Sequence, residues 1–501
     1  MLRKLCVAAL LLTALSAGAA AQNNAAQAVA AASKAMGVDT LTSITFSGTA
    51  RNGQFGQSKL IAQPMAPINT TVVTQYTRTV TFAPATMGLV SRATGPTQPP
   101  TVPGIPAPMP GVFNQNINVM QASGQWAQAL NIWLTPWGCL KGAAANTATV
   151  RTQGGNQLVT WSPAAFKSPS GLMYSVTCTL NNQNLVTRTE TRVENTVVGD
   201  LLVEFDYSNY RNLNGVQVPG RMVQRQAGME TFNADITAAT ANPTNLAELL
   251  TPPPAPAGAP GGAPAAAPAA PPAAAPQQAA GPAVERLGDG VFKIGGNHTA
   301  LAVDMGDHIL VVESGQSDAR GMAVMAAAKQ AIPNKPIRFV VNSHPHFDHG
   351  SGLRAAAAEG ATILMGQADA ATMQRLLSLP STLSGDSLSK QPNRRVTVQG
   401  IGDREIRRGT NGKVVEIHRI TDGPHNDSQV LVYLPAERII HTADVPVAGM
   451  PNPNQRLLLN ATLATIQRLN LQWDSMIPSH PTNPERVVPR AEIQTLSTAT
   501  N

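Results

Sequence analysis

The sequence predicts an α/β (α+β) fold in two parts, a mostly antiparallel β domain followed by a domain in which strands and helices alternate. Three observations lead to this prediction. Residues 251–283 are mostly Pro, Ala and Gly, a composition that cannot bury a core and that forms an extended linker. Runs of β-forming residues joined by turn signals precede this tract, and mixed strand and helix patterns follow it. The length of 501 residues is enough for two or three domains.

The first 21 residues have the pattern of a secretory signal peptide. Arg3 and Lys4 form a basic start, residues 5–17 are apolar, and three alanines end at Ala21 before Gln22. This apolar run is too short to span a bilayer, and no other segment of the sequence is long and apolar enough. We therefore expect residues 1–21 to be cleaved near Ala21–Gln22, giving a periplasmic or secreted protein without a transmembrane segment.

Residues 22–250 make up the predicted antiparallel β-rich domain. Its expected elements are a helix at 25–36, a strand at 70–82, a proline-rich loop at 96–110, a hairpin at 173–193, a strand at 201–207 and a tight turn at Asn214-Gly215. Residues 207–219 resemble strand pairs in periplasmic half-barrel domains of the lipoprotein-carrier type. Such a sheet can enclose an apolar ligand or serve as a scaffold, and both interpretations stay open.

Residues 284–501 make up the second predicted domain. Its expected strands lie at 290–296, 300–305, 308–313, 336–342, 396–398, 414–420, 429–434 and 438–440, and its expected helices at 317–332, 353–359, 367–379 and 457–471. This mixture fits two sheets packed together with helices outside.

The most informative motif of the chain lies between the strand at 336–342 and the helix at 353–359. It reads His344-x-His346-x-Asp348-His349, four potential metal ligands within six positions. Imidazole and carboxylate groups suit Zn²⁺ and other first-row metals, and four ligands in so short a stretch are more than one ion needs. We expect them on a strand-to-helix loop, where backbone turns can direct several side chains at one point.

This motif resembles the signature of the metallo-β-lactamase superfamily, and three further motifs of that family follow in order. They lie at 422–427 with His425, at 438–444 with Asp444, and at 476–481 with His480. The resemblance covers about residues 284–501. It implies an αββα sandwich with metal ions at the edge where loops from both sheets converge.

The resemblance also implies a division of the ligands between two ions, most simply two zinc ions. The first ion would be held by His344, His346 and His425, the second by Asp348, His349 and His480, with Asp444 shared between them. Three neutral imidazoles leave a tetrahedral ion one position for water, as a catalytic site requires. The ligand types also leave iron and manganese open.

The chain departs from the common family pattern in three places that are not ligands. The third motif lacks the usual Thr-Pro-Gly lead-in, Pro481 replaces a glycine after the last histidine, and Glu313-Ser314-Gly315 stands where many members have Asp-x-Gly. Each departure touches the surroundings of the ligands, so the resemblance does not identify the substrate.

The remaining histidines and cysteines are less informative. We expect His308 and His418 to be ordinary surface or core residues. His441 lies three residues before Asp444 and could support a ligand, and His298 follows a Gly-Gly turn and could border the site; neither receives an assigned role. Cys139 and Cys178 could form one disulfide in an exported protein or remain two separate thiols. The sequence does not decide between these.

The leading hypothesis is an exported metal-dependent hydrolase that cleaves an ester, lactone, amide or related bond in a small-molecule substrate. A bridging hydroxide would attack, and Asp348 would act as the catalytic residue that orients it and accepts its proton. One alternative is an iron-dependent oxidoreductase on the same fold. Another is an envelope ligand-binding protein that acts through the N-terminal β domain.

The charge distribution argues against nucleic acid as a partner. The formal net charge is +7, but the basic pairs at 394–395 and 407–408 are short and lie among polar and acidic residues. Nucleic-acid binding favours a continuous basic stripe interleaved with aromatic residues. The oligomeric state is open.

Overall fold

The computed structural model describes residues 24–82, 88–94, 113–118, 126–164, 166–250, 281–447, 449, 451 and 453–498. The predicted signal peptide (1–21), the proline-rich tract (96–110) and most of the predicted linker (251–280 of 251–283) lie outside the described residues.

The N-terminal domain is built on one antiparallel sheet, as predicted. Within the described residues its order is β4-β3-β2-β1-β11-β10-β9-β8-β7-β6-β5. The strands are β1 (Ser43–Asn52), β2 (Thr71–Thr81), β3 (Gly88–Thr94), β4 (Phe113–Asn118), β5 (Ala148–Gln153), β6 (Asn156–Trp161), β7 (Val176–Leu180), β8 (Val186–Asn195), β9 (Gly199–Leu213), β10 (Val216–Gln226) and β11 (Met229–Ala241). β7 and β8 form the expected hairpin, and the turn at Asn214-Gly215 joins β9 to β10 with both residues at positive φ.

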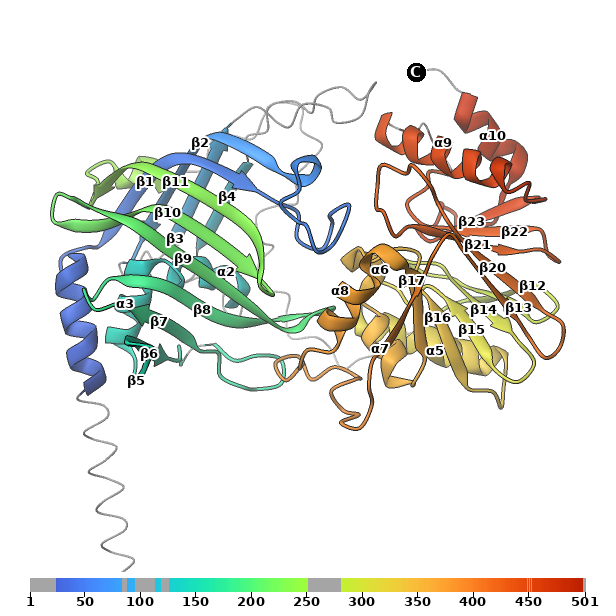
Figure 1. The fold of residues 1–501 in the computed structure, drawn as a ribbon, viewed down its shortest axis with the longest axis horizontal. Coiled ribbons are helices and arrows are strands. Elements are labelled where there is room, and N and C mark those ends of the chain that lie inside the picture. Colours follow the sequence, from blue (N-terminus) through green and yellow to red (C-terminus); the bar gives the residue numbers. More distant parts are fainter. Residues whose placement is uncertain are drawn as a thin grey trace, which may run out of the picture.

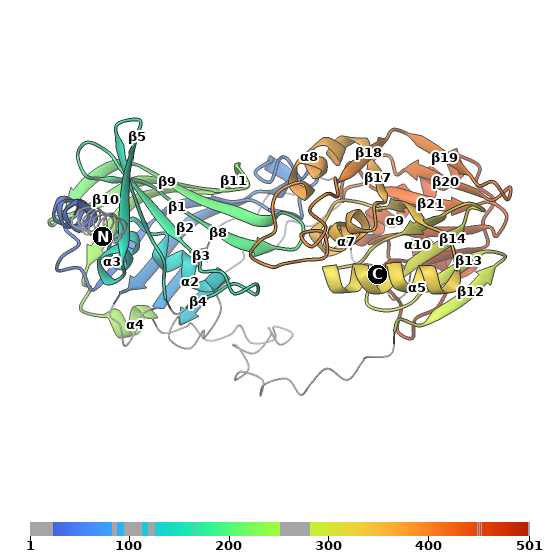
Figure 2. The same ribbon diagram turned by 90° about the horizontal axis from the view of Figure 1, so that it is seen from below.

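Short helices cover the concave face of this sheet (Figures 1 and 2). They are the helix at 24–36, α2 (Trp126–Trp133), α3 (Pro136–Ala145) and α4 (Leu246–Leu250), while η1 (Pro67–Asn69) lies in the connection between β1 and β2. α3 begins at Thr135, whose side chain accepts a hydrogen bond from the backbone N–H of Gly138. A disulfide joins Cys139 of α3 to Cys178 of β7 and so fixes the helix on the sheet.

The C-terminal domain contains two sheets. The seven-stranded sheet, in the order β12 to β18, comprises β12 (Val284–Gly288), β13 (Val291–Ile294), β14 (Ala300–Asp304), β15 (Ile309–Val312), β16 (Ile337–Val341), β17 (Thr362–Gly366) and β18 (Thr397–Ile401). The six-stranded sheet, in the order β19 to β24, comprises β19 (Arg404–Arg408), β20 (Val414–Arg419), β21 (Val430–Leu434), β22 (Ile439–Thr442), β23 (Ser475–Pro478) and β24 (Val488–Pro489). β15 to β18 are parallel, and the uniformly buried residues of β15 fit a strand covered on both faces.

Helices cover the outer faces of both sheets, which gives the expected αββα sandwich (Figures 1 and 2). They are α5 (Asp318–Ala331), α6 (Phe347–Gly350), α7 (Leu353–Ala358), α8 (Gln367–Leu377), α9 (Pro453–Arg468) and α10 (Arg490–Thr498). Alternation along β15 shows why the layers form: Leu310 and Val312 belong to the core between the sheets, while Ile309 and Val311 belong to the core under the helices.

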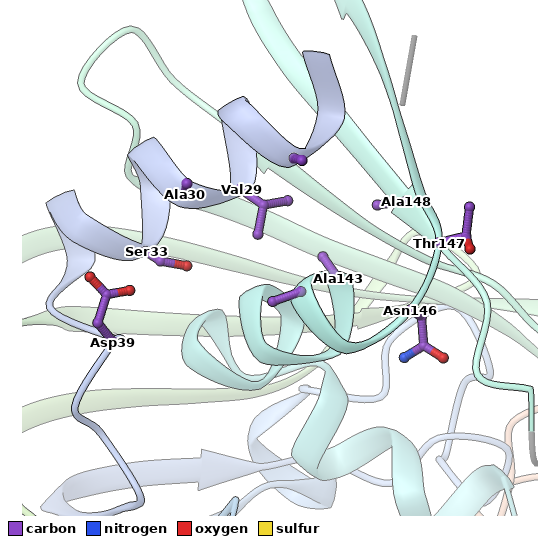
Figure 3. Close-up of a pocket in the computed structure, with 10 residues that line it drawn as sticks. Val29, Ala30, Ser33, Asp39, Ala143, Asn146, Thr147 and Ala148 are labelled. Atoms are coloured by element: carbon purple, nitrogen blue, oxygen red, sulfur yellow. The ribbon is translucent and has the colours of Figure 1, made fainter. Parts of the chain in front are cut away.

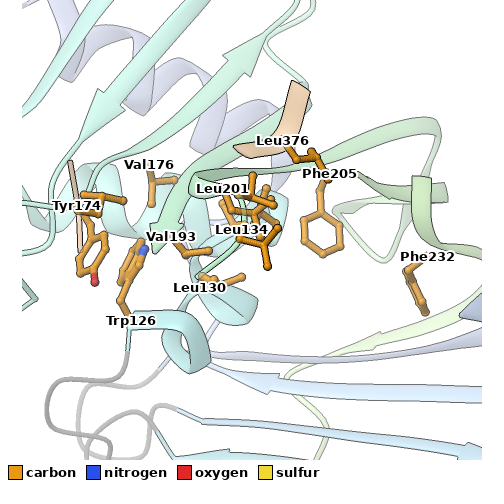
Figure 4. Packing of buried hydrophobic residues seen from close by; sticks show 14 of the residues in the cluster. Trp126, Leu130, Leu134, Tyr174, Val176, Val193, Leu201, Phe205, Phe232 and Leu376 are labelled. Atoms are coloured by element: carbon orange, nitrogen blue, oxygen red, sulfur yellow. The ribbon is translucent and has the colours of Figure 1, made fainter. Parts of the chain in front are cut away.

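The two domains share a continuous interface. In Figure 4, Leu376 of α8 lies beside Phe205 of β9, and both belong to one buried cluster that includes residues of both domains. Asp200 of β9 accepts hydrogen bonds from the backbone N–H groups of Thr382 and Leu383. The β domain therefore packs directly on the sandwich.

Two further features of the structure concern ligand binding by the N-terminal domain and membrane association. A pocket of about 370 Å³ separates the helix at 24–36 from α3, lined by residues such as Val29, Ser33, Ala143 and Asn146 (Figure 3). Figure 1 places this helix on the side of the β domain that faces away from the sandwich. None of the helices in the described part of the chain is long and apolar enough to cross a membrane.

Candidate metal centre

The motif at 344–349 follows β16, at the carboxyl end of the parallel part of its sheet. His344 and His346 lie in the connection after β16, where both side chains are buried. The prediction of a loop is wrong for Asp348 and His349, because they lie in the short helix α6, with His346 at its N-cap position. Because the motif passes from a connection into a helical turn, its residues can contribute to two clusters.

The other three predicted residues come from the six-stranded sheet. His425 lies between β20 and β21, Asp444 follows β22, and His480 follows β23. β22 and β23 are parallel, so their carboxyl ends lie side by side and bring Asp444 and His480 together. Asp444 adopts a positive φ of 60°, which turns the chain sharply at this point.

Three histidines form the first cluster. The Nε2 atoms of His344 and His425 are 3.1 Å apart, and the ring of His346 lies 4.5 Å from the first ring and 4.4 Å from the second, between centroids. Two nitrogen ligands on one tetrahedral zinc, each at ~2.0–2.1 Å, are separated by about 3.3 Å. The spacing fits a metal ion.

Two histidines and one aspartate form the second cluster. The Nε2 atoms of His349 and His480 are 3.1 Å apart, and the Oδ2 atom of Asp348 lies 3.4 Å from the first and 3.5 Å from the second. One carboxylate oxygen and two imidazole nitrogens at these distances also fit a metal ion.

Asp444 lies between the clusters. Its Oδ2 atom is 3.2 Å from Nε2 of His344 and 3.0 Å from Nε2 of His349, and its Oδ1 atom is 3.0 Å from Nε2 of His480. A carboxylate in contact with both clusters can bridge two cations and offset their mutual repulsion. The structure thus brings all seven predicted residues together.

His298 is a residue that the sequence left without a role and that the structure places at the second cluster. Its Nε2 atom lies 3.9 Å from Oδ2 of Asp348, and it forms a four-residue group of potential ligands with Asp348, His349 and His480. The side chain is 3% exposed, and neither ring nitrogen has a hydrogen-bond partner among the described residues. The only local signal was the Gly295-Gly296 turn before it.

Glu313 explains one departure from the family pattern. This fully buried carboxylate accepts a hydrogen bond from Nδ1 of His349 at 3.0 Å and another from the backbone N–H of Ser343 at 2.7 Å. An ionised carboxylate can only accept, so the proton of this imidazole lies on Nδ1 and its Nε2 faces the second cluster. Glu313 therefore orients a predicted ligand.

Comparison with known proteins agrees with these motifs. Residues 294–450 match the family model described as "Metallo-beta-lactamase superfamily", a range that includes six of the seven predicted residues and leaves out His480. This stretch of the chain belongs to the metallo-beta-lactamase superfamily. Members of the superfamily are mostly hydrolases.

One curated relative is 2,4-dinitroanisole O-demethylase subunit alpha from Nocardioides sp. (strain JS1661), 26% identical over 201 residues. The match covers 38% of this chain and 53% of the relative, so the chain spans about half the length of the relative that it matches.

Two solved structures are also similar to part of this chain. A metallo-beta-lactamase from Pontibacter korlensis is 16% identical with a TM-score of 0.32, and the match covers 43% of this chain and 97% of that one. The sec-alkylsulfatase Pisa1 from Pseudomonas sp. is 16% identical with a TM-score of 0.31, covering 43% of this chain and 41% of that one.

The two clusters of this metallo-beta-lactamase domain differ in their protonation. Burial lowers the pKa of His344, and burial with the neighbouring His425 lowers the pKa of His346 to about 4. Hydrogen bonds to Asp348 and Asp444 instead raise the pKa of His480 to about 9. His344 and His346 are therefore neutral at pH 7, whereas His480 of the second cluster holds a proton that a metal ion must displace.

The carboxylates of the site are ionised. Burial alone would raise the pKa of Asp444, but the surrounding histidines, led by His344, hold it well below its usual range. Burial is likewise outweighed at Asp348, where the neighbouring histidines, led by His298 and His480, lower the pKa. Both side chains are therefore anionic acceptors at any physiological pH.

A pocket opens beside the second cluster of the domain. It has a volume of about 420 Å³ and is lined by Asp444 and His480 together with residues from the loops after β22 and β23, among them Val445, Val447 and Thr482. A small molecule in this pocket would contact Asp444, which lies between the two clusters, and His480 of the second cluster.

Proposed function

We propose that this chain is an exported metal-dependent hydrolase with a dinuclear centre, most simply of zinc. The observation that carries the proposal is the position of Asp444, in contact with imidazole nitrogens of both clusters at 3.0–3.2 Å. The first ion would be held by His344, His346 and His425 and the second by Asp348, His349 and His480, with His298 as a further donor to the second ion.

The bound ions would supply a water molecule of lowered pKa and a Lewis acid for the substrate oxygen. The chain's own residues supply position. Asp348 is ionised, so it accepts a hydrogen bond from the attacking water and orients it, and its lowered pKa favours this role over keeping a proton. The pocket beside Asp444 and His480 would hold the substrate with its reactive bond next to this water.

The substrate class proposed is a small molecule with a hydrolysable ester, lactone, amide or related bond. The curated relative is named for O-demethylation of 2,4-dinitroanisole, an aryl methyl ether, so activated aryl ethers belong in the same set. The pocket of about 420 Å³ suits a molecule of this size.

Export is part of the proposal and is supported by the sequence of residues 1–21 and by the disulfide between Cys139 and Cys178. Disulfides persist in oxidising compartments such as the periplasm. Comparing the N-terminal sequence of the mature protein with Gln22 tests the cleavage position.

The proposal is tested by counting metal ions in purified protein and its variants. Wild-type protein should bind two equivalents of zinc and hydrolyse at least one member of a panel of chromogenic esters, lactones, lactams, thioesters, phosphodiesters and nitrophenyl ethers. His346→Ala should lose the first equivalent, and Asp444→Ala should weaken both because the two cations are then no longer bridged. Mutation of a residue that hydrogen-bonds to a metal ligand typically lowers metal affinity or activity by ~10–100-fold, so loss of a direct ligand should lower zinc affinity at least as much.

His418→Ala is a matched control, since this buried histidine pairs with Glu416 away from the site. It should keep both equivalents. Tight binding of two zinc ions by both His346→Ala and Asp444→Ala would refute the ligand assignment. One equivalent of iron in protein purified without added metal, with oxygen consumption, would instead support the oxidoreductase alternative.

A further inference from the structure

A loop of the N-terminal domain lies against the metal-binding motif. This β1–β2 loop, residues 53–66, leaves the sheet after β1 and extends toward α6 of the sandwich (Figure 1). Phe55 packs edge-on against Phe347 with ring centroids 5.2 Å apart, and the backbone N–H of Phe347 donates to the carbonyl of Gly56 at 3.0 Å. The loop therefore contacts the motif between the ligands His346 and Asp348.

The next contact of the loop is with a predicted ligand of the first ion. The backbone carbonyl of Ser58 accepts a hydrogen bond from Nε2 of His346 at 3.0 Å and another from the side-chain amide of Asn426 at 3.2 Å. A carbonyl oxygen can only accept, so the proton of His346 lies on Nε2. Nδ1 then keeps its lone pair, which is the state that a metal ligand needs.

A third contact reaches a predicted ligand of the second ion. The side-chain amide of Gln57 donates to Oδ1 of Asp348 at 2.9 Å. The other oxygen, Oδ2, is the one that lies 3.4 Å and 3.5 Å from the Nε2 atoms of His349 and His480. By holding Oδ1, Gln57 leaves Oδ2 as the oxygen that faces the second cluster.

The loop is fixed in this position on both sides of Ser58. Gly56 has a φ of +78°, and an added Cβ would lie only 2.5 Å from the ring of Phe347. Beyond Ser58, the backbone N–H of Ile61 donates to the buried carboxylate of Asp369 at 2.8 Å, and the carbonyl of Lys59 accepts from the N–H of Asp427 at 3.0 Å. Three consecutive residues, 56–58, thus contact three consecutive residues of the motif, 346–348.

We propose that the β1–β2 loop is a functional part of the metal centre. Ser58 is a positioning residue for His346, and Gln57 is a positioning residue for Asp348. The N-terminal domain is then joined to the sandwich because it completes the outer contacts of the ligands. The inference rests on the proposed metal centre, and it assigns the β domain a role in catalysis through the ligands rather than a separate ligand-binding function.

The test uses the full-length protein with two loop variants and one control. Gln57→Ala removes the hydrogen bond to Asp348, and Gln57 is exposed, so the fold should be retained. Gly56→Val forces the loop away from Phe347 and moves the Ser58 carbonyl from His346. Gln54→Ala changes another exposed glutamine of the same loop and is the control.

Zinc affinity is measured by competition with a chromogenic chelator, and the ligand geometry by the visible spectrum of the cobalt-substituted protein. Gln57→Ala should weaken the second equivalent, and Gly56→Val the first, each by about 10–100-fold, with an altered cobalt spectrum. Gln54→Ala should match the wild type in both. A role in packing alone would lower the thermal stability of the metal-free protein and leave affinity and spectrum unchanged.

Wild-type affinity and spectrum in Gln57→Ala overturn the positioning role of Gln57, and the same result in a folded Gly56→Val overturns that of Ser58. In either case a loss of zinc in His346→Ala keeps the proposed function intact. If the wild-type protein itself binds no metal, the proposed function fails and this inference fails with it.

Discussion

The buried carboxylate of Glu313 accepts a hydrogen bond from Nδ1 of His349 at 3.0 Å, and this pairing joins β15 to the ligands of the second ion. The charge of Glu313 and that of Asp444 outweigh burial and raise the pKa of His349 to about 10. The carboxylate therefore fixes the orientation of the ring and increases its basicity, two properties that strengthen a metal ligand.

Glu313→Gln should weaken the second metal site while leaving the first intact. The amide keeps the shape but loses the negative charge, so zinc affinity at the second site should fall by about 10–100-fold. Titration with a chelator competitor measures both equivalents. Glu437→Gln is the control, because Glu437, whose side chain is 8% exposed, pairs with Lys413 outside the site. Equal affinities in Glu313→Gln and wild type would contradict the role of Glu313.

His298→Ala should also act on the second site alone. The buried ring has no hydrogen-bond partner among the described residues, so its removal leaves no orphaned partner and tests only its contribution as a donor. We expect weaker binding of the second equivalent and a changed cobalt spectrum, with the first equivalent retained. A spectrum identical to that of the His418→Ala control would show that His298 does not contact the ion.

The two sites should differ in their pH dependence. In the metal-free protein the pKa values of His480 and His349 are about 9 and about 10, so both are protonated at pH 7 and an entering ion must displace their protons. Affinity at the second site should rise by up to ~10-fold per pH unit for each displaced proton and level off near pH 10.

The first site lacks this competition from His344 and His346, whose pKa values are lowered. Calorimetry in buffers of different ionisation enthalpy counts the protons released with each equivalent. The same proton release for both equivalents would contradict the assignment of the two clusters.

A buried ion pair supports the helix behind the motif. Arg354 of α7 donates to Asp386 at 2.5 Å, and both are almost fully buried. Arg354→Met should destabilise the protein by about 3–5 kcal/mol, because it leaves a buried carboxylate without its partner. Burial alone would raise the pKa of Asp386, but the hydrogen bonds from Arg354 and Ser381 lower it below its ordinary value.

A lowered folded-state pKa contributes stability that is present above pH ~4 and is lost as the pH falls through the folded value. Denaturant unfolding of the wild type between pH 3 and pH 7 should show this loss, and the variant should show less of it. A variant as stable as the wild type at pH 7 would contradict the prediction.

The sequence predicted the sandwich and its metal motifs because these signals are local. Buried strands such as β15 are continuous apolar runs, and the ligands lie in four short motifs. The half-exposed, charged strand β19 (Arg404–Arg408) was missed, since its sequence has no apolar alternation. The contacts of the loop at 53–66 were also missed. They pair Ser58 with His346, 288 residues away, and no local pattern encodes such a distant carbonyl.

The position of β1 in its sheet has a consequence for biogenesis. β1 pairs with β2 on one side and with β11 on the other. The pairing with β11 can form only after most of the domain has been synthesised. The loop that follows β1 then meets ligands that are made still later, up to His480. Contacts of such large sequence separation form slowly. The nascent chain therefore has no complete set of ligands until His480 has been synthesised.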